Sequence, residues 1–362
     1  MTSTRLAILG TGLIGTSIAM AAIRAGDAAT GWDPDAGHAE RAGERGGFPA
    51  ASSLEEAVRD ADIVIVASPI ATLAGVATRA LGAAPGAIVS DAGSVKHIVV
   101  EAVTDAAGEG AARFVGGHPM GGSERSGPEH ASASVVDDIV WVLTPTSATD
   151  PDAVERLEAW VGSIGARPVR MDPARHDRLV AFVSHLPQVA ATSLMGLVAD
   201  EEADEPEILL LAAGGFRDLT RLAASNPVLW SEILLSNREA IAGAIDLYVA
   251  RLTRLRDLIG HAALDDVRAA FADAKAARLT LAAKPQVRSG VAVIQVPIPD
   301  RPGALAQLTA ALGESGVNIE DLQIVHSHEG GRGTVHLTVA ATAADVAATT
   351  LAAQAFDPTR LA

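Results

Sequence analysis

Three glycines near the N-terminus constrain the fold more than any other feature of this chain. Gly10, Gly12 and Gly15 follow the apolar run LAIL and precede an apolar, Ala-rich stretch over residues 14–25. The first glycine permits a tight turn, the second lets a pyrophosphate approach the backbone, and the third lets a helix pack on a strand. The helix start would then face the anion. The spacing predicts a strand–turn–helix unit that binds a dinucleotide, and a glycine turn without a ligand is the alternative.

Asp33 ends the next predicted strand, about twenty residues beyond the glycines, where a carboxylate accepts hydrogen bonds from the adenosine ribose hydroxyls. No Arg or Lys lies between Gly31 and Glu40 to hold a 2′-phosphate, and a carboxylate would repel one. The sequence therefore favours NAD over NADP. The predicted cofactor contacts are Gly10, Gly12, Leu13, Ile14, Gly15, Asp33, Ser68 and Pro69.

The periodicity of apolar residues changes along the chain. From residue 5 to about residue 171, short β-branched runs alternate with Ala-rich stretches, which is typical of parallel βαβ units. After Asp172 the strand pattern stops, and helical stretches follow at about 175–199, 208–223 and 226–258. Their apolar character exceeds what one buried face requires, which predicts a homodimer formed by helix packing.

The residues KPQVRSG, 284–290, interrupt the helical pattern and resemble a linker. Beyond it the order of strand, helix, strand, strand and helix predicts a split βαβ module. Only FDPTRLA follows the last helix, so the fourth strand of such a module should be short or missing. We expect a Rossmann-type doubly wound α/β domain over 1–172, an all-α dimerisation and substrate domain over 173–284, and a small α+β ferredoxin-like domain over 290–362.

Composition excludes several classes of function. The chain has no cysteine, which removes disulfides, thiolate zinc sites and a cysteine nucleophile, and which suits a reducing compartment. A formal net charge of -16 opposes extended contact with nucleic acid. No uninterrupted apolar run reaches membrane-spanning length, and the N-terminal glycines suit a strand and helix better than an export signal. We expect a cytoplasmic protein without nucleic-acid or membrane partners.

Polar residues gather where a doubly wound sheet holds its ligand, beyond the carboxyl ends of the strands. They lie in SDAGSVK (90–96), in GGHPMGGSERSG (116–127) and between His176 and His185. His118 follows a predicted strand and sits in a Gly-rich loop, where packing gives no reason for a histidine. It is therefore a candidate functional residue, and a structural histidine is the alternative.

The segments GTGLIGTS, DAGSVK, GGHPMGGSERSG, HDRLVAFVSHLPQ and GFRDLTRLAASNPVLWSEILLSN, in this order and spacing, resemble the prephenate and arogenate dehydrogenases of tyrosine biosynthesis. The tail, with PDRPGALAQLTAALGESGVNIEDL, resembles the ACT domains, which bind amino acids, usually between paired copies. The resemblance implies NAD-dependent oxidative decarboxylation of prephenate to 4-hydroxyphenylpyruvate. Arogenate as the substrate, another reductase of similar architecture and a non-catalytic amino-acid sensor are the alternatives.

The resemblance also implies roles for residues. His118 would accept the proton of the ring hydroxyl, which requires a neutral imidazole, and Ser94 would bridge histidine, hydroxyl and nicotinamide. Arg221 would grip a substrate carboxylate, with Ser225 on the same side of its helix. The roles of Lys96 and Arg217 stay open: either could face solvent or belong to the site. The predicted substrate contacts are Arg221, His176, His185, Gln188, Ser225 and Ser123.

Two further features concern specificity and regulation. Where some relatives read HLPH this chain reads HLPQ, so Gln188 leaves the choice between prephenate and arogenate open. In the tail, a glycine turn before a helix start suits the carboxylate of an amino acid, with tyrosine as the expected effector and a ligand-free module as the alternative. The predicted effector contacts are Asp300, Pro302, Gly303 and, by resemblance, Asn318. No metal site is predicted, because no carboxylate of recognisable spacing accompanies His326, His328 and His336.

Overall fold

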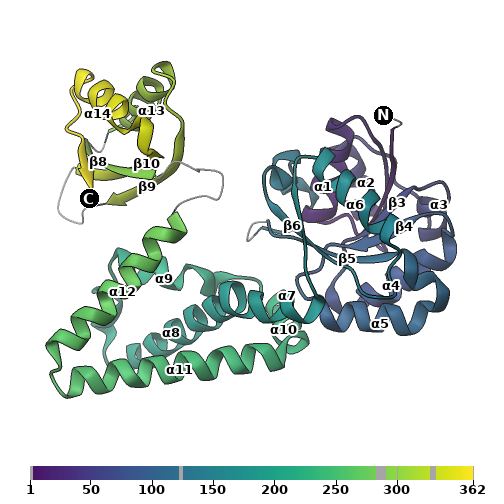
Figure 1. The fold of residues 1–362 in the computed structure, drawn as a ribbon, viewed down its shortest axis with the longest axis horizontal. Coiled ribbons are helices and arrows are strands. Elements are labelled where there is room, and N and C mark those ends of the chain that lie inside the picture. Colours follow the sequence, from purple (N-terminus) through teal and green to yellow (C-terminus); the bar gives the residue numbers. More distant parts are fainter. Residues whose placement is uncertain (1–2, 122–124, 283–290, 300, 327–331, 362) are drawn as a thin grey trace. The chain divides into compact units, whose positions relative to one another are not determined.

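The computed structural model describes residues 3–121, 125–282, 291–299, 301–326 and 332–361, and these form two compact units. Unit 1 draws on residues 1–193 and 222–247, and unit 2 draws on residues 194–221 and 248–362 (Figure 1). The predicted boundaries at 172 and 284 follow the sequence pattern and stay a prediction. Unit 1 contains the glycine loop and His118, and unit 2 contains the C-terminal module.

Unit 1 is built on a seven-stranded sheet with the order β2-β1-β3-β4-β5-β6-β7. The strands are β1 (Arg5–Leu9), β2 (Ala28–Trp32), β3 (Ile63–Val66), β4 (Ile88–Asp91), β5 (Phe114–Pro119), β6 (Val140–Thr144) and β7 (Arg167–Arg170). β1 to β5 pair in parallel, which confirms the predicted doubly wound α/β fold. The strand order reverses between β1 and β3, and such a switch point is where open α/β sheets bind their ligands.

Helices cover both faces of this sheet (Figure 1). Leu6 and Ile8 of β1 enter one buried cluster, whereas Ala7 and Leu9 enter a second. Successive side chains of a strand point to opposite faces, so both faces of this sheet are buried. The helices are α1 (Leu13–Arg24), α2 (Ala36–Gly46), α3 (Leu54–Val58), α4 (Ile70–Ala83), α5 (His97–Ala107) and α6 (Pro151–Ser163).

The far side of the sheet departs from the expected parallel pattern. β6 pairs antiparallel with β5, placing His118 opposite Val142. The described part of the connection between them contains two short 3-10 turns and packs on α1, where Ser132 N–H donates to Ser17 Oγ at 3.1 Å. It therefore supplies no α-helical crossover of the kind that joins parallel strands. β7, with the sequence RPVR, was not predicted because two arginines in four residues give no apolar signal.

The helical part confirms the predicted all-α character but is more interrupted than expected. A π-turn, Ala181–His185, separates α7 (Pro173–Val180) from α8 (Leu186–Glu202). α9 (Gly214–Thr220) ends in a 3-10 turn, η6 (Arg221–Ala224), and α10 (Pro227–Ser236) is separated from α11 (Arg238–Gly260) at Asn237. The last helix of this part is α12 (Leu264–Ala282).

The helical part also exposes many apolar side chains. Val183 and Leu235 are 71% and 70% exposed, and Leu210 and Leu211 are more than 80% exposed. The helical run Pro173–Glu202 is long and apolar enough to cross a membrane by length and composition, although no uninterrupted apolar run was expected to qualify. Interface helices of soluble proteins share this composition, because an interface buries apolar surface just as a core does.

The C-terminal module confirms the predicted ferredoxin-like order. Its antiparallel sheet has the order β11-β8-β10-β9, and Ile294, Leu308 and Leu337 are fully buried in its core. The fourth strand is present but only three residues long, as the short tail predicted. The elements are β8 (Val291–Pro299), α13 (Ala304–Glu314), β9 (Ile319–His326), β10 (Arg332–Ala340), α14 (Ala344–Ala353) and β11 (Thr359–Leu361).

Candidate functional site

The glycine loop joins β1 to α1 at the switch point of the sheet. Gly10 has a φ of +99°, and a Cβ there would lie 2.6 Å from the carbonyl oxygen of Ala67. A Cβ at Gly15 would lie 2.0 Å from the carbonyl oxygen of Gly10, whereas a Cβ at Gly12 would meet nothing within 4 Å. Packing therefore requires Gly10 and Gly15, while Gly12 faces open space.

The start of α1 suits an anion. The first intrahelical bond runs from Thr16 N–H to Gly12 O at 3.0 Å, which leaves the N–H groups of Leu13, Ile14 and Gly15 without helical partners. No side chain caps this helix start. Free N–H groups beside an open face are what a pyrophosphate needs, so the residues present fit a dinucleotide.

Asp33 lies beside this loop. Its Oδ2 accepts a hydrogen bond from Thr11 N–H at 3.0 Å, so the carboxylate holds the loop in place. At the end of β3, the Oγ of Ser68 is buried without a hydrogen-bond partner among the described residues. Pro69 follows it and begins α4. Both therefore lie at the same edge of the sheet as the glycine loop.

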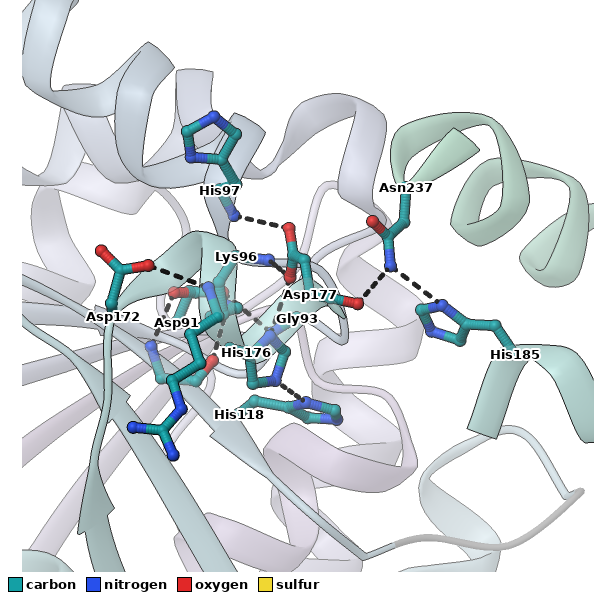
Figure 2. A network of polar contacts seen from close by, with 12 residues as sticks. Asp91, Gly93, Lys96, His97, His118, Asp172, His176, Asp177, His185 and Asn237 are labelled. Atoms are coloured by element: carbon teal, nitrogen blue, oxygen red, sulfur yellow. Dashed lines mark hydrogen bonds and ion pairs between the residues drawn. The ribbon is translucent and has the colours of Figure 1, made fainter. Parts of the chain in front are cut away.

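Lys96 is a buried site residue, not a surface lysine. Its side chain is fully buried, and its ammonium group makes an ion pair with Asp91 and donates to Gly117 O at 2.6 Å (Figure 2). The carboxylate of Asp91 also accepts from Gly93 N–H at 2.9 Å and from Gly117 N–H at 3.0 Å. Lys96 and Asp91 thus hold both polar backbone groups of the residue that precedes His118.

His118 lies near the end of β5 and not, as we expected, in the Gly-rich loop that follows the strand. It belongs to a chain of three polar side chains. Its Nδ1 is 2.8 Å from Nε2 of His176, and Nδ1 of His176 is 2.8 Å from Oδ1 of Asp177 (Figure 2). His176 and Asp177 are buried on α7, whereas His118 is half-buried. Helix α7 thus supplies two buried polar side chains, one in contact with the His118 ring and one behind it.

The carboxylate of Asp177 also caps the N-terminal end of α5. Its two carboxylate oxygens accept from Lys96 N–H and His97 N–H, each at 2.8 Å, at the start of α5. Its backbone carbonyl accepts from Asn237 Nδ2 at 2.8 Å, and the same amide lies 3.2 Å from Nδ1 of His185 (Figure 2). The carboxylate of Asp177 therefore connects the start of α5 with His176, and its backbone carbonyl connects α7 with Asn237.

Burial favours the neutral form of two imidazoles in this region, those of His118 and His185. Burial lowers the pKa of His118 well below its ordinary value, and the positive charge of Lys96 lowers it further. Burial likewise lowers the pKa of His185 to about 4, against the opposing charge of Asp177. Burial also lowers the pKa of Lys96, which the carboxylate of Asp91 opposes. A neutral His118 can accept a proton at neutral pH, as general-base chemistry requires.

Gln188 and Ser225 contact each other. Gln188 is buried and donates from Nε2 to Leu222 O at 2.8 Å, while Ser225 donates to its Oε1 at 3.3 Å. Ser225 lies beyond the η6 turn and therefore does not share an α-helical face with Arg221, contrary to our expectation. Arg221 and Arg217 are exposed residues of unit 2.

The remaining predicted site residues either make few contacts or lie outside the described residues. Ser94 is half-buried in the β4–α5 loop, and its hydroxyl makes no hydrogen bond within the described part of the chain. Ser123 lies outside the described residues, as do Asp300 and His328 of the tail. Gly303, directly after Pro302, has a φ of +86° at the start of α13. Asn318 donates to Glu320 at 2.7 Å.

His336 lies on β10, and His326 is the last residue of β9. Among the described residues no group of three or more His, Cys, Asp or Glu side chains is placed to hold a metal ion. Sequence reasoning missed Asp91, Asp177 and Asn237 and left Lys96 undecided. The one available signal was that Asp91 and Lys96 stand beside apolar stretches, GAIVS and HIVVEAV, where a charge needs a partner.

Comparison with known proteins covers all three parts of the chain. The sequence model of the prephenate dehydrogenase nucleotide-binding domain matches residues 18–170, that of the prephenate dehydrogenase dimerization domain matches residues 172–273, and that of the ACT domain matches residues 292–355. The chain is 32% identical over 338 residues to a prephenate dehydrogenase of Bacillus subtilis, covering 91% of each protein. It is 33% identical to a cyclohexadienyl dehydrogenase of Zymomonas mobilis, covering 78% of this chain and 98% of that one.

Solved structures agree. The prephenate dehydrogenase of Aquifex aeolicus, crystallised with hydroxyphenyl propionate and NAD+, superposes with a TM-score of 0.73 at 29% identity and covers 78% of this chain and 99% of its own. An arogenate dehydrogenase of Synechocystis superposes with a TM-score of 0.67 at 28% identity, over 76% and 98% of the two chains. With its nucleotide loop, its histidine-lined sheet edge and these matches along nearly its whole length, the chain belongs to the prephenate dehydrogenase family.

Proposed function

We propose that this chain is an NAD-dependent prephenate dehydrogenase of tyrosine biosynthesis, which converts prephenate into 4-hydroxyphenylpyruvate with loss of CO2. The observation that carries the proposal is the state of His118. It is a neutral imidazole at the carboxyl edge of a nucleotide-binding sheet, oriented by buried partners. The structure of the Aquifex relative with NAD+ and a hydroxyphenyl compound supports the same assignment.

NAD+, when bound at the glycine loop, supplies the hydride acceptor. Gly12 and the free N–H groups of Leu13 and Ile14 would hold its pyrophosphate, and Asp33 its adenosine ribose. The negative charge of Asp33 favours NAD+ over NADP+, because a 2′-phosphate would meet a carboxylate. Ser68 and Pro69 stand at the neighbouring strand end, where the unpartnered hydroxyl of Ser68 can bond the cofactor.

The proton of the ring hydroxyl passes to Nε2 of His118 as the hydride leaves the same ring carbon. The C–C bond to the ring carboxylate then breaks, its electron pair enters the ring, and CO2 departs. The oxygen that becomes a phenolate takes the proton back from His118. Ser94, in the loop before Lys96, would orient the hydroxyl, and Arg221 would bind a carboxylate through its bidentate guanidinium group.

His118→Asn tests the role of the base. We expect kcat to fall by about 10² to 10⁴, which is the usual contribution of a general base, while the Kd for NAD+ stays near wild type. Initial rates of NADH formation with prephenate, together with NAD+ titration, measure both quantities. A variant whose kcat lies within threefold of wild type would remove His118 from catalysis.

Arogenate is the second candidate substrate, favoured by the similarity to the Synechocystis arogenate dehydrogenase. Prephenate and arogenate differ only in a keto or amino group on the side chain. Gln188, which contacts Ser225, would affect this choice, and His185 and Ser123 would complete the pocket. Rates with each substrate decide between them, and a preference for arogenate would overturn the assignment of prephenate.

We also propose a soluble, cytoplasmic homodimer formed by the helical part, whose exposed apolar side chains suit an interface between copies. The ACT module would bind an amino acid at the predicted contacts Asp300, Pro302, Gly303 and Asn318, and tyrosine is the expected effector. Because tyrosine is the end product, its binding should inhibit.

Truncation tests this regulation. An enzyme without residues 288–362 should remain active and lose inhibition by tyrosine, and Asn318→Ala in the full chain should weaken inhibition in the same direction. Dose–response curves at matched prephenate concentration measure both. Equal inhibition of the full and truncated enzymes would place tyrosine at the active site, and inhibition of neither would exclude tyrosine as the effector.

A further inference from the structure

We propose that Asp177 and His176 are positioning residues that fix the proton of His118 on Nδ1, so that Nε2 carries the lone pair that accepts the substrate's proton. The proposal rests on the proposed role of His118 as the base. It assigns a task to Asp177, which sequence reasoning did not identify. It also assigns to His176 a task other than contact with substrate.

The hydrogen bonds determine which ring nitrogens carry protons, one step at a time from Asp177 to His176 to His118. An ionised carboxylate only accepts hydrogen bonds, so Nδ1 of His176, 2.8 Å from Asp177 Oδ1, must carry a proton. The proposed arrangement requires a neutral His176, whose other nitrogen then carries no proton, so that Nε2 of His176 is an acceptor. Its partner at 2.8 Å, Nδ1 of His118, must therefore donate. The remaining nitrogen of His118, Nε2, is left as the acceptor.

Burial makes this arrangement rigid. His176 is 1% exposed and Asp177 is 5% exposed, so water does not compete for their hydrogen bonds. Asp177 is held in turn by two backbone N–H groups of α5, at Lys96 and His97. The ring of His118 also packs edge-to-face on His176, with centroids 5.0 Å apart. The ring is therefore fixed in both orientation and tautomer.

The charge of Asp177 serves the reaction as well. When Nε2 of His118 takes up a proton, the ring becomes an imidazolium whose Nδ1–H still faces His176. The positive charge is then two hydrogen bonds away from a buried carboxylate, which lowers the energy of this state. In other enzymes an aspartate behind a catalytic histidine holds the tautomer in this way, and its amide replacement costs about 10⁴ in kcat.

Two substitutions of His176 distinguish the effect of its hydrogen bond to His118 from the effect of the space that its side chain fills. His176→Leu fills the space but cannot accept from His118, so we expect kcat to fall at least about 30-fold with KM for prephenate unchanged within twofold. His176→Gln can donate to Asp177 and accept from His118, so it should recover kcat to within about fivefold of wild type. The exposed His261→Gln is the matched control. A Leu variant within threefold of wild type, or a Gln variant as slow as the Leu variant, overturns the proposal.

A spectroscopic measurement separates this proposal from the proposed function. In the full-length enzyme with ¹⁵N-labelled histidine, long-range ¹H–¹⁵N spectra report which ring nitrogen is protonated, and His118→Asn assigns the signal. We expect the Nδ1–H tautomer for His118 and its loss in Asp177→Asn. The Nε2–H tautomer in the wild type overturns the positioning role while leaving the activity untouched. The expected tautomer, together with an active His118→Asn variant, supports the positioning role and overturns His118 as the base.

Discussion

The loop after β1 and the loops after β4 and β5 lie on one edge of the same sheet, yet they differ in how far their polar groups are already hydrogen-bonded. The glycine loop keeps backbone N–H groups without partners beside open space at Gly12. At the ends of β4 and β5, charged side chains are buried and already bonded, as in the pair of Lys96 with Asp91 and in Asp177 with the start of α5.

The difference follows from what each loop has to do. A loop that binds an anion gains by leaving donors free, because the ligand then completes their hydrogen bonds. A loop that orients a base gains by satisfying every group except the reacting nitrogen, because a buried network holds one geometry. Stability should therefore depend strongly on the histidine side of the site and weakly on Gly12. All four tryptophans, Trp32, Trp141, Trp160 and Trp230, lie in unit 1, so their fluorescence reports its unfolding.

The largest effect is expected for Lys96→Met. Removing the ammonium group leaves the carboxylate of Asp91 buried without its counter-ion, which typically costs about 3 to 5 kcal/mol. Urea denaturation followed by tryptophan fluorescence measures the change. In the double variant Lys96→Met/Asp91→Asn the charge is gone as well, so part of the loss should return. A Lys96→Met protein as stable as wild type would contradict the expectation that stability depends more on the histidine side of the site than on the glycine loop.

A smaller effect is expected from acid. The pKa of His185 is lowered to about 4 by burial, whereas the unfolded chain titrates near the ordinary histidine value of about 6.5. Between these values the unfolded chain binds a proton that the folded chain does not, so stability falls as pH falls. We expect this histidine to remove about 2 kcal/mol between pH 7 and pH 5. His185→Gln should reduce the loss, and an equal loss in both proteins would contradict the assignment.

The smallest effect on stability is expected for Gly12→Ala. Its Cβ meets nothing within 4 Å, and its φ of -69° is open to alanine, so the free energy of unfolding should change by less than about 1 kcal/mol. The Kd for NAD+ should nevertheless rise at least about tenfold, since the methyl group occupies the approach of the pyrophosphate. Gly15→Ala, whose Cβ would clash with Gly10, is the contrast and should destabilise unit 1. An unchanged Kd for Gly12→Ala would place the cofactor elsewhere.

The features that sequence reasoning found are those fixed by neighbours along the chain. The glycine spacing specifies a turn and a helix start within six residues, and the alternation of β-branched runs specifies buried strands. The order of elements in the C-terminal module was predicted from the same local patterns, and its fourth strand was expected to be short or missing. Sequence reasoning also identified His118 and assigned its role by family resemblance, although it placed this residue in a loop and not on β5.

The features it missed depend on residues distant in sequence. Lys96 N–H and its partner Asp177 are 81 residues apart, and nothing near either residue indicates that they meet. The reversal of β6 depends on how its connection packs on α1, and the split of the helix at the π-turn depends on what its two halves contact. A pattern of neighbours cannot show which charged side chains a fold will bury.

The position of Asp177 has a consequence for the order of synthesis. A ribosome completes all seven strands of the nucleotide sheet by Arg170, before it adds the two residues that complete the hydrogen-bond chain behind His118. Asn237, which ties Asp177 to His185, arrives later still. A nascent chain can therefore form its nucleotide fold while His118 still lacks a defined tautomer, so a truncated translation product would hold the cofactor without consuming it.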